Sequence, residues 1–192
     1  MRLLIAAIIG GVVLFIWGAV AHMALPIGEM GMKVAVEQDA ALSALQASAT
    51  QGEGVYVIPG FAPEKMSDTA FIDAFTEKYK ASPAALVIYQ PGGNPALASM
   101  VPNLVKQFVS GTLAAFVVAW ILALGVFGFG RRVLIAGALG LFCWLAISVP
   151  YWNWYLFPAK FTLGALLEQV IGWLLAGAAI AWWLGRSERR LR

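Results

Sequence analysis

The side chains best placed to do chemistry are the polar ones that interrupt or flank long apolar runs. Glu168, followed by Gln169, is the only acidic residue inside such a run. A charge at membrane depth is costly and usually faces a bundle interior or a wet cavity, which makes Glu168 the first functional candidate. Its candidate partners enter the apolar runs from the same side and are His22, Lys106, Gln107 and Ser110. The pattern predicts an outward-facing polar pocket, and the alternative is a single Glu–Lys pair that holds two helices together.

Sulfur and imidazole side chains lie close together after the first apolar run. His22 and Met23 are followed by Met30 and Met32, and thioethers with imidazole suit Cu(I). Zinc and haem sites need several His or Cys ligands at set spacing, whereas this chain has one His and the single Cys143. The sequence therefore allows a Cu(I) site at these four residues, and no other cofactor is expected. The simpler interpretation is that the methionines pack an outer domain onto the membrane surface.

Motifs for catalysis are weak. Lys106 and Ser110 are four residues apart, share a helix face and resemble a serine–lysine nucleophile pair. No Gly-x-Ser-x-Gly elbow or oxyanion-hole motif accompanies them, and His22 is the only histidine available to a triad. Lysines at a membrane interface commonly extend toward the headgroups. An enzyme is therefore the least expected class, and no catalytic residue is assigned.

Four apolar segments position these polar residues. Of the 192 residues, 61% are hydrophobic and 12% are charged, and the mean hydropathy is +0.80, which is too apolar for a soluble domain. A membrane-spanning helix takes about 20 apolar residues, and the runs that fit are 3–21, 108–129, 133–149 and 163–184. The third is the shortest. The first is longer than the apolar core of a signal peptide, which favours an uncleaved anchor over a cleaved leader.

Arginines predict the orientation, because Lys and Arg are retained on the cytoplasmic side of short loops. All seven arginines lie before the first run, after the fourth, or between the second and third, where Arg131 and Arg132 are expected in a tight turn. Both termini are therefore expected in the cytoplasm. Segment 26–103 is then outside and carries eight acidic residues against four lysines, a net charge of −4. Nucleic acid is not an expected partner, because this exposed segment is acidic.

Aromatic and small residues complete the membrane pattern. The Trp- and Tyr-rich segment 150–158 is expected to be an interfacial loop, with Trp182 and Trp183 as an anchor at the other face. The Gly-rich segment 125–130 is interpreted as a helix terminus and not as a phosphate-binding loop. Small residues four apart let helices approach closely, and each run contains one such pair: Ala7 with Gly11, Gly111 with Ala115, Ala136 with Gly140, and Gly172 with Ala176. These pairs predict a packed bundle.

Segment 26–103 has a different pattern, in which Gly and Pro punctuate short amphipathic stretches. It predicts a helix over 34–49, a strand over 55–58, a helix from near Ser67 or Asp68, and a strand over 85–89. We expect a small α/β layer in which the strands pair and the helices cover one face. A two-stranded sheet is marginal in water, so another chain adding to its edges is one expectation. The other is that the helices alone cover a small core.

Short motifs in the first half of the chain carry a family resemblance. Residues 17–22 end the first run with Trp and His, Leu25-Pro26 follows, 54–59 read Gly-x-Tyr-x-x-Pro, and 79–83 form a Pro-containing strand entry. With these motifs the chain resembles a family of uncharacterised bacterial four-span inner-membrane proteins with a small periplasmic α/β domain. Many members have Gly where this chain has Ser82. The resemblance covers mainly the first 95 residues and implies a bacterial inner membrane, with no catalytic residue to carry over.

These patterns together predict an all-α bundle of four transmembrane helices with a small extracytoplasmic α/β domain inserted between the first two. Residues 1–25 are expected to form the first span, 26–103 the outer domain, and 104–192 the other spans with a cytoplasmic tail. The expected function is non-enzymatic: an accessory, assembly or envelope-interaction subunit whose partners are the bilayer and a second copy or another membrane protein. The alternative is a small transport or Cu(I)-handling protein that uses the polar pocket.

The predicted orientation can be tested by cysteine labelling. In a Cys143→Ser background, the single substitutions Glu64→Cys and Ser187→Cys report on the two sides. We expect a membrane-impermeant maleimide added to spheroplasts to label position 64, and to label position 187 only after permeabilisation, because the arginines hold their loops in the cytoplasm. The Cys143→Ser parent is the control for background. Labelling of position 187 in sealed spheroplasts would contradict the orientation.

Overall fold

The chain forms two compact units in a computed structural model that describes residues 1–189. One unit consists of residues 1–33 together with 99–189, and the other is Val34–Ala98. Four helices in the first unit are long and apolar enough to cross a membrane, and they span Arg2–Ala24, Val101–Ala123, Phe129–Tyr155 and Ala159–Arg189. The prediction of four such helices is confirmed.

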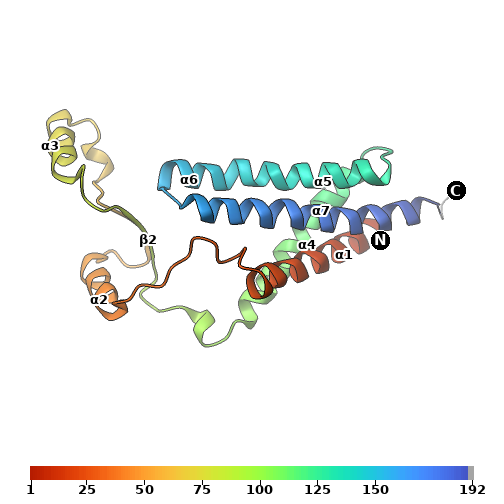
Figure 1. The fold of residues 1–192 in the computed structure, drawn as a ribbon, viewed down its shortest axis with the longest axis horizontal. Helices are drawn as coiled ribbons and strands as arrows, with labels where there is room; N and C mark the ends of the chain where they lie inside the picture. The colour runs from red at the N-terminus through yellow and green to blue at the C-terminus, as the bar shows by residue number, and fades with distance from the viewer. Residues whose placement is uncertain (190–192) are drawn as a thin grey trace. The chain divides into compact units, whose positions relative to one another are not determined.

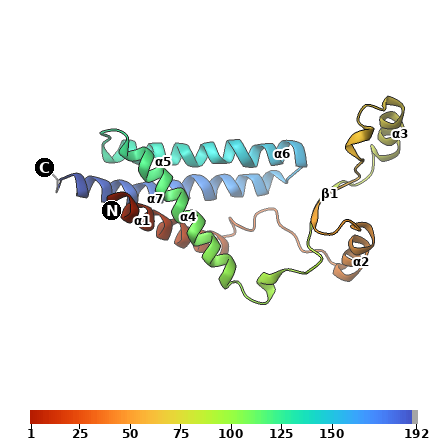
Figure 2. The same ribbon diagram turned by 180° about the vertical axis from the view of Figure 1, so that it is seen from behind.

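Two of these helices contain a wider π-helical turn. The first consists of α1 (Arg2–Ala19) and the π-helical turn Val20–Ala24. The third joins α5 (Phe129–Cys143), the π-helical turn Trp144–Ser148 and α6 (Val149–Tyr155). The second and fourth are α4 (Val101–Ala123) and α7 (Ala159–Arg189). Figures 1 and 2 show α5 and α6 running alongside α7.

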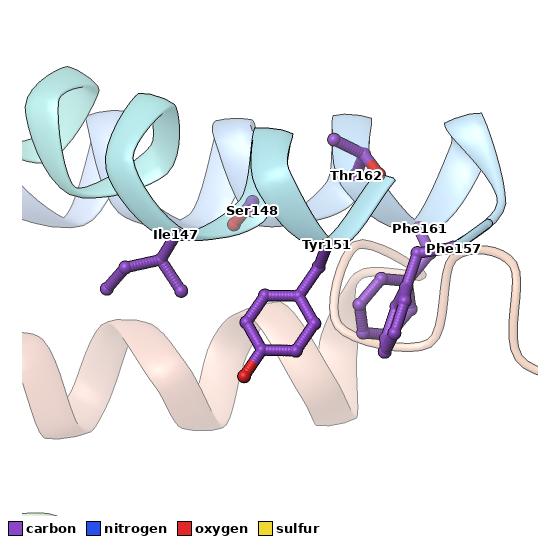
Figure 3. A pocket seen from close by; sticks show the side chains of 6 residues that line it. All are labelled: Ile147, Ser148, Tyr151, Phe157, Phe161 and Thr162. Atoms are coloured by element: carbon purple, nitrogen blue, oxygen red, sulfur yellow. The ribbon is translucent and has the colours of Figure 1, made fainter. Parts of the chain in front are cut away.

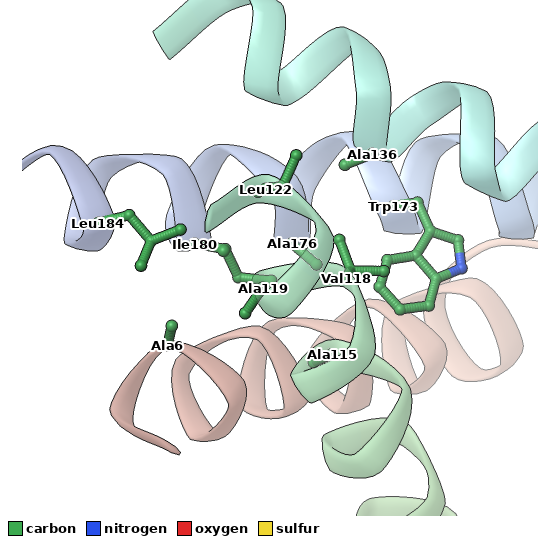
Figure 4. Close-up of a cluster of buried hydrophobic side chains, with 10 residues drawn as sticks. All are labelled: Ala6, Ala115, Val118, Ala119, Leu122, Ala136, Trp173, Ala176, Ile180 and Leu184. Carbon is green, nitrogen blue, oxygen red and sulfur yellow. The ribbon is translucent and has the colours of Figure 1, made fainter. Parts of the chain in front are cut away.

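Helix α7 is the centre of this unit, because both α1 and α5 pack against it and α4 packs against α1. The buried core is rich in alanine, with a few larger side chains between the helices (Figure 4): Ala6, Ala115, Val118, Ala119, Leu122, Ala136, Trp173, Ala176, Ile180 and Leu184. Lipid tails are as apolar as the helices, so hydrophobicity alone does not bring helices together in a bilayer. Small side chains do so by allowing close contact.

The small-residue pairs predicted from the sequence are buried or lie at close contacts, except for Gly111. Gly10 and Gly177, which were not in those pairs, also lie at close contacts. A Cβ atom on Gly177 would overlap Ala136, and a Cβ on Gly140 would lie 2.7 Å from the carbonyl oxygen of Gln169, so α5 and α7 touch closely. A Cβ on Gly10 of α1 would lie 2.7 Å from Ile180 of α7. Gly111 alone faces open space, with nothing within 4 Å of the added atom.

Helix α4 and the turn after it differ from expectation. α4 begins at Val101, before the expected residue 108, because Pro102 fits the first turn of a helix. It ends at Ala123, and the chain turns over the next five residues. Arg131 and Arg132 were expected in that turn but belong to the first turns of α5, which begins at Phe129. The Gly-rich segment is a helix boundary, as predicted.

The aromatic segment before α7 was predicted to be a loop, and that prediction is wrong for most of its length. The helix continues through Tyr155, because Pro150 occupies the first turn after the π-helical turn, where its missing N–H costs least. The third helix is therefore longer than the apolar run suggests. The chain reverses at Leu156, which adopts a left-handed conformation with φ 59°, and Pro158 precedes α7.

The second unit contains one two-stranded antiparallel sheet. Strand β1 (Gly54–Ile58) pairs antiparallel with β2 (Ala85–Tyr89), with Val55 opposite Ile88 and Val57 opposite Leu86. Both predicted strands and their pairing are confirmed. The other elements of this unit are α2 (Gln38–Ser48), α3 (Thr69–Tyr79) and the 3-10 turns Pro63–Lys65 and Pro95–Leu97.

The helices of this unit do not cover the sheet as predicted. Neither α2 nor α3 contains a buried residue. The aromatic face of α3 is satisfied locally instead, because Phe71 and Phe75 pack against Phe61, with ring centroids 5.8 and 5.0 Å apart. The predicted cap of α3 is confirmed, since Asp68 Oδ1 accepts a hydrogen bond of 3.0 Å from the N–H of Phe71. α2 begins at Gln38 and is shorter than expected.

The close contact of α5 with α7 generates a stability test. Gly177→Ala places a methyl group where Ala136 lies, so we expect the free energy of unfolding in detergent to fall by about 1–3 kcal/mol. Gly111→Ala is the matched control, because its methyl group meets open space and alanine favours a helix over glycine. Equal stability of the two variants would contradict the packing.

Candidate functional site

The structure brings two of the predicted polar residues together at the end of α1. His22 lies in the π-helical turn Val20–Ala24, a widened geometry that often occurs at functional sites. Its Nε2 lies 3.5 Å from Oε1 of Glu168 on α7. The indole N–H of Trp17 donates a 3.0 Å hydrogen bond to the carbonyl oxygen of Glu168, one turn before His22. Two contacts therefore fix this end of α1 to the same turn of α7.

A third member of the site comes from the segment after α1. The chain folds back at once, and the N–H of Gly28 donates to the carbonyl oxygen of Ala21 at 3.0 Å. This turn places Glu29 Oε1 3.5 Å from Nδ1 of His22. Side-chain exposure rises along the series, from 31% for Glu168 through 45% for His22 to 60% for Glu29. The site is an imidazole held between two carboxylates.

The two contacts of His22 use different ring nitrogens, and this limits the chemistry of the site. The nitrogens of an imidazole point away from each other, so one metal ion cannot sit between the ring and both carboxylates. Among residues 1–189, no three or more His, Cys, Asp or Glu side chains are arranged to hold a metal ion. An imidazole in this position is suited to exchanging protons with its neighbours, because each ring nitrogen faces a carboxylate.

The segment that follows α1 also packs on α7 through glycine. Gly31, with φ +82°, lies so close to Phe161 that an added Cβ would be 2.8 Å from its backbone nitrogen. On the other side, a Cβ on Gly164 would be 2.7 Å from the carbonyl oxygen of Ile27 and 3.1 Å from Cβ of Met30. We call residues 25–33 the strap, since they lie against the first turns of α7.

The other predicted site residues do not join this group. Lys106, Gln107 and Ser110 are exposed on α4 and make no side-chain hydrogen bond or ion pair within the described part of the chain. Gln169 is partly buried, and its backbone oxygen faces Gly140. The ion-pair partner of Glu168 in the described residues is the histidine, and no lysine is paired with it.

The four residues proposed for Cu(I) have different environments. Met23 is 86% exposed and Met32 is 58% exposed, while Met30 packs against Gly164. Both nitrogens of His22 face carboxylates. The arrangement therefore places Met30 in a packing contact with α7, and it offers the imidazole to carboxylates.

A second polar group at the other end of the bundle was not found from the sequence. Arg132 is 2% exposed, and its Nη2 lies 2.7 Å from Oε1 of Glu188 on α7. Arg2 Nη2 lies 3.9 Å from the same oxygen, and the indole N–H of Trp183 donates to the carbonyl oxygen of Arg2 at 3.1 Å. One carboxylate thus joins three helices. The available signal was a single acid, Glu188, among arginines.

An apolar pocket of about 240 Å³ lies beside α6 (Figure 3), and no motif in the sequence marks it. Its lining residues are Ile147, Ser148, Tyr151, Phe157, Phe161 and Thr162. None of them is charged, and the wall is held in place by a 2.8 Å hydrogen bond from the indole N–H of Trp144 to the carbonyl oxygen of Thr162. Such a mostly apolar surface suits hydrocarbon, and Tyr151 is the one lining residue with an ionisable side chain.

Comparison of the chain with models of protein families, with curated proteins and with solved structures finds no match. The function must therefore be argued from the residues and their geometry.

The arginine group generates a second stability test. Glu188→Gln leaves the buried Arg132 without its carboxylate, and we expect the free energy of unfolding to fall by about 1–3 kcal/mol, less than for a fully buried pair because Glu188 is partly exposed. Glu77→Gln is the matched control, since Glu77 makes an exposed 2.7 Å pair with Lys80 that is worth at most about 1 kcal/mol. A loss no larger than the control's would show that the pair does not hold the helices.

Proposed function

We propose that this protein is a non-enzymatic membrane-anchored interaction subunit. In this proposal the four helices hold the chain in a bacterial inner membrane, with both termini in the cytoplasm. The unit Val34–Ala98 is the extracytoplasmic part, and it binds another protein of the envelope. The orientation rests on the arginines, which flank the helices on one side only.

The main support for the proposal is the exposed face of the two-stranded sheet. Directly opposite residues of an antiparallel pair share a face, so Val55, Val57, Leu86 and Ile88 form one aliphatic surface. Val55 is 64% exposed and Ile88 is 79% exposed. Isolated two-stranded sheets are marginal in water, and exposed apolar faces of this kind mark interaction sites. A partner strand or surface would complete the sheet.

The charge of this unit favours a partner other than a second copy. Val34–Ala98 contains seven Asp and Glu residues against three lysines, a net charge of −4. Two such units repel each other, whereas a basic partner surface is attracted. The open strand edges additionally suit an extended segment of the partner, which adds main-chain hydrogen bonds to the sheet.

The alternative function, small-molecule or ion transport, finds support in the contact of His22 with Glu168. Transport of an ion or small molecule would need polar side chains that continue along α7 beyond this contact. From Gly172 to Leu184 the buried residues of α7 are all Gly, Ala, Trp, Ile or Leu, so this part of α7 presents no buried polar side chain on the way to Glu188. The interaction proposal is therefore preferred.

The partner proposal is tested by site-specific photo-crosslinking in the host membrane. With a photoreactive amino acid in place of Val57, we expect a covalent adduct with a second, different protein, because Val57 lies in the middle of the aliphatic face. The yield is expected to fall as ionic strength is raised, since charges contribute to the binding. Mass spectrometry of the adduct identifies the partner.

A photoreactive residue in place of Asp73, on α3 and pointing to solvent, is the matched control. Absence of an adduct from position 57, or an equal yield from both positions, would contradict the proposal. An adduct of two copies of this chain would show that the unit self-associates despite its charge.

A further inference from the structure

We propose that His22 is a proton-operated latch that holds the strap, residues 25–33, against α7. The inference goes beyond the proposed function, because it concerns a movement within the chain and requires no partner. It rests on the two carboxylates that face the imidazole from two different elements. Glu29 belongs to the strap and Glu168 to α7, so the ring joins the two.

The strength of this connection depends on the charge of the ring. A neutral imidazole has one N–H donor, so it can hydrogen-bond only one of the two carboxylates while its unprotonated nitrogen faces the other. An imidazolium ion has a donor on each nitrogen and carries a positive charge between two negative ones. The connection between strap and helix is therefore complete only when the imidazole is protonated.

No other charged group within the described residues is paired with this site. The ion pairs of His22 are with Glu29 from the strap and with Glu168 from α7, and none comes from α4 or from the rest of α1. The imidazole is also close to Gly28, where a side chain would overlap the ring. Imidazole side chains as a class change charge between about pH 5 and pH 8.

The remaining contacts of the strap with α7 are contacts of shape. Gly31 lies against Phe161, and Ile27 and Met30 lie against Gly164. The backbone hydrogen bonds that begin in the strap at Met30 and Met32 end on Ile27 and Glu29, inside the strap itself. The N–H groups of Leu25 and Gly28 donate to the carbonyl oxygens of Val20 and Ala21, so the start of the strap stays bound to the end of the first helix. With the imidazole neutral, the part of the strap beyond Gly28 is retained against α7 by packing. Since the strap leads directly into Val34, its release lengthens the tether of the second unit.

The latch is tested by hydrogen–deuterium exchange of the full chain in lipid nanodiscs, at about pH 5.5 and about pH 8. Rates are corrected for the intrinsic pH dependence of amide exchange. We expect the amides of residues 29–33 to be about 3- to 10-fold more protected at the lower pH, the size expected from two partly exposed ion pairs. Protection in the core of α7 is expected to be the same at both pH values.

Three variants make the outcome specific to the imidazole. His22→Asn removes the titrating group, and the strap is expected to show low protection at both pH values. His22→Lys carries a permanent charge and is expected to show higher protection than His22→Asn, with no difference between the two pH values. Glu168→Gln is expected to reduce the pH difference, because one of the two carboxylates no longer attracts the ring.

Equal protection of the strap at both pH values in the unmodified chain would overturn the latch. A pH difference that survives in His22→Asn would also overturn it, because another group would then be responsible. Unchanged exchange in α7 shows in each variant that the bundle remains folded, so a change in the strap is not an effect of misfolding. The exchange of the strap and that of α7 can both be interpreted whether or not a partner binds the second unit.

Discussion

The close approach of neighbouring helices to α7 at glycine positions is the constraint on which the rest of the first unit depends. At Gly177 and Gly140 there is no room for even one methyl group between α5 and α7, and Gly10 of α1 lies against the side chain of Ile180 on α7. In a bilayer, helices gain little from hydrophobicity on meeting, so van der Waals contact and interhelical hydrogen bonds decide the pairing. The indole donors of Trp17 and Trp183 supply such bonds near the two ends of α1.

The same constraint explains where polar groups occur. Where the helices touch closely, α7 presents small and apolar residues, among them Gly177, Trp173 and Ile180. Charged groups collect where the packing ends, with Glu168 near one end of α1 and Glu188 near the other. Each acid contacts a basic side chain from the first helix, so that helix is fixed to α7 by shape along its length and by a polar contact near each end.

Much of this architecture follows from the sequence, and the failures have identifiable causes. Apolar runs predict the four helices because a spanning helix must be continuously apolar, and Asp68 predicts a helix start because its short carboxylate caps free N–H groups. Helix ends are less predictable, since Pro150 is tolerated inside the third helix only after a π-helical turn that composition does not reveal. Which element covers the sheet depends on tertiary contacts that the sequence pattern does not reveal. In the structure the aromatic face of α3 packs against Phe61.

The polar site shows the same division. The depth of Glu168 in an apolar run indicates its importance, and His22 is a predicted partner that the structure places beside it. Glu29 was not predicted, because its approach to His22 depends on a reversal of the chain at Gly28 that leaves no periodic signal. Lys106 and Ser110 share a helix as expected, yet they lie on an exposed part of α4. Sequence spacing shows that two residues share a helix face, but it does not show whether another element packs against that face.

The distance along α7 between its two acidic residues indicates which bilayer thickness suits this helix. Glu168 and Glu188 are 20 positions apart, which corresponds to about 30 Å along a helix and equals the thickness of a typical hydrocarbon core. A markedly thicker bilayer would draw one of the two charged groups into hydrocarbon, and a thinner one would tilt the helix. Hydrophobic mismatch of this kind sorts proteins among membranes of different thickness. The spacing of Glu168 and Glu188 therefore favours a hydrocarbon core of about 30 Å.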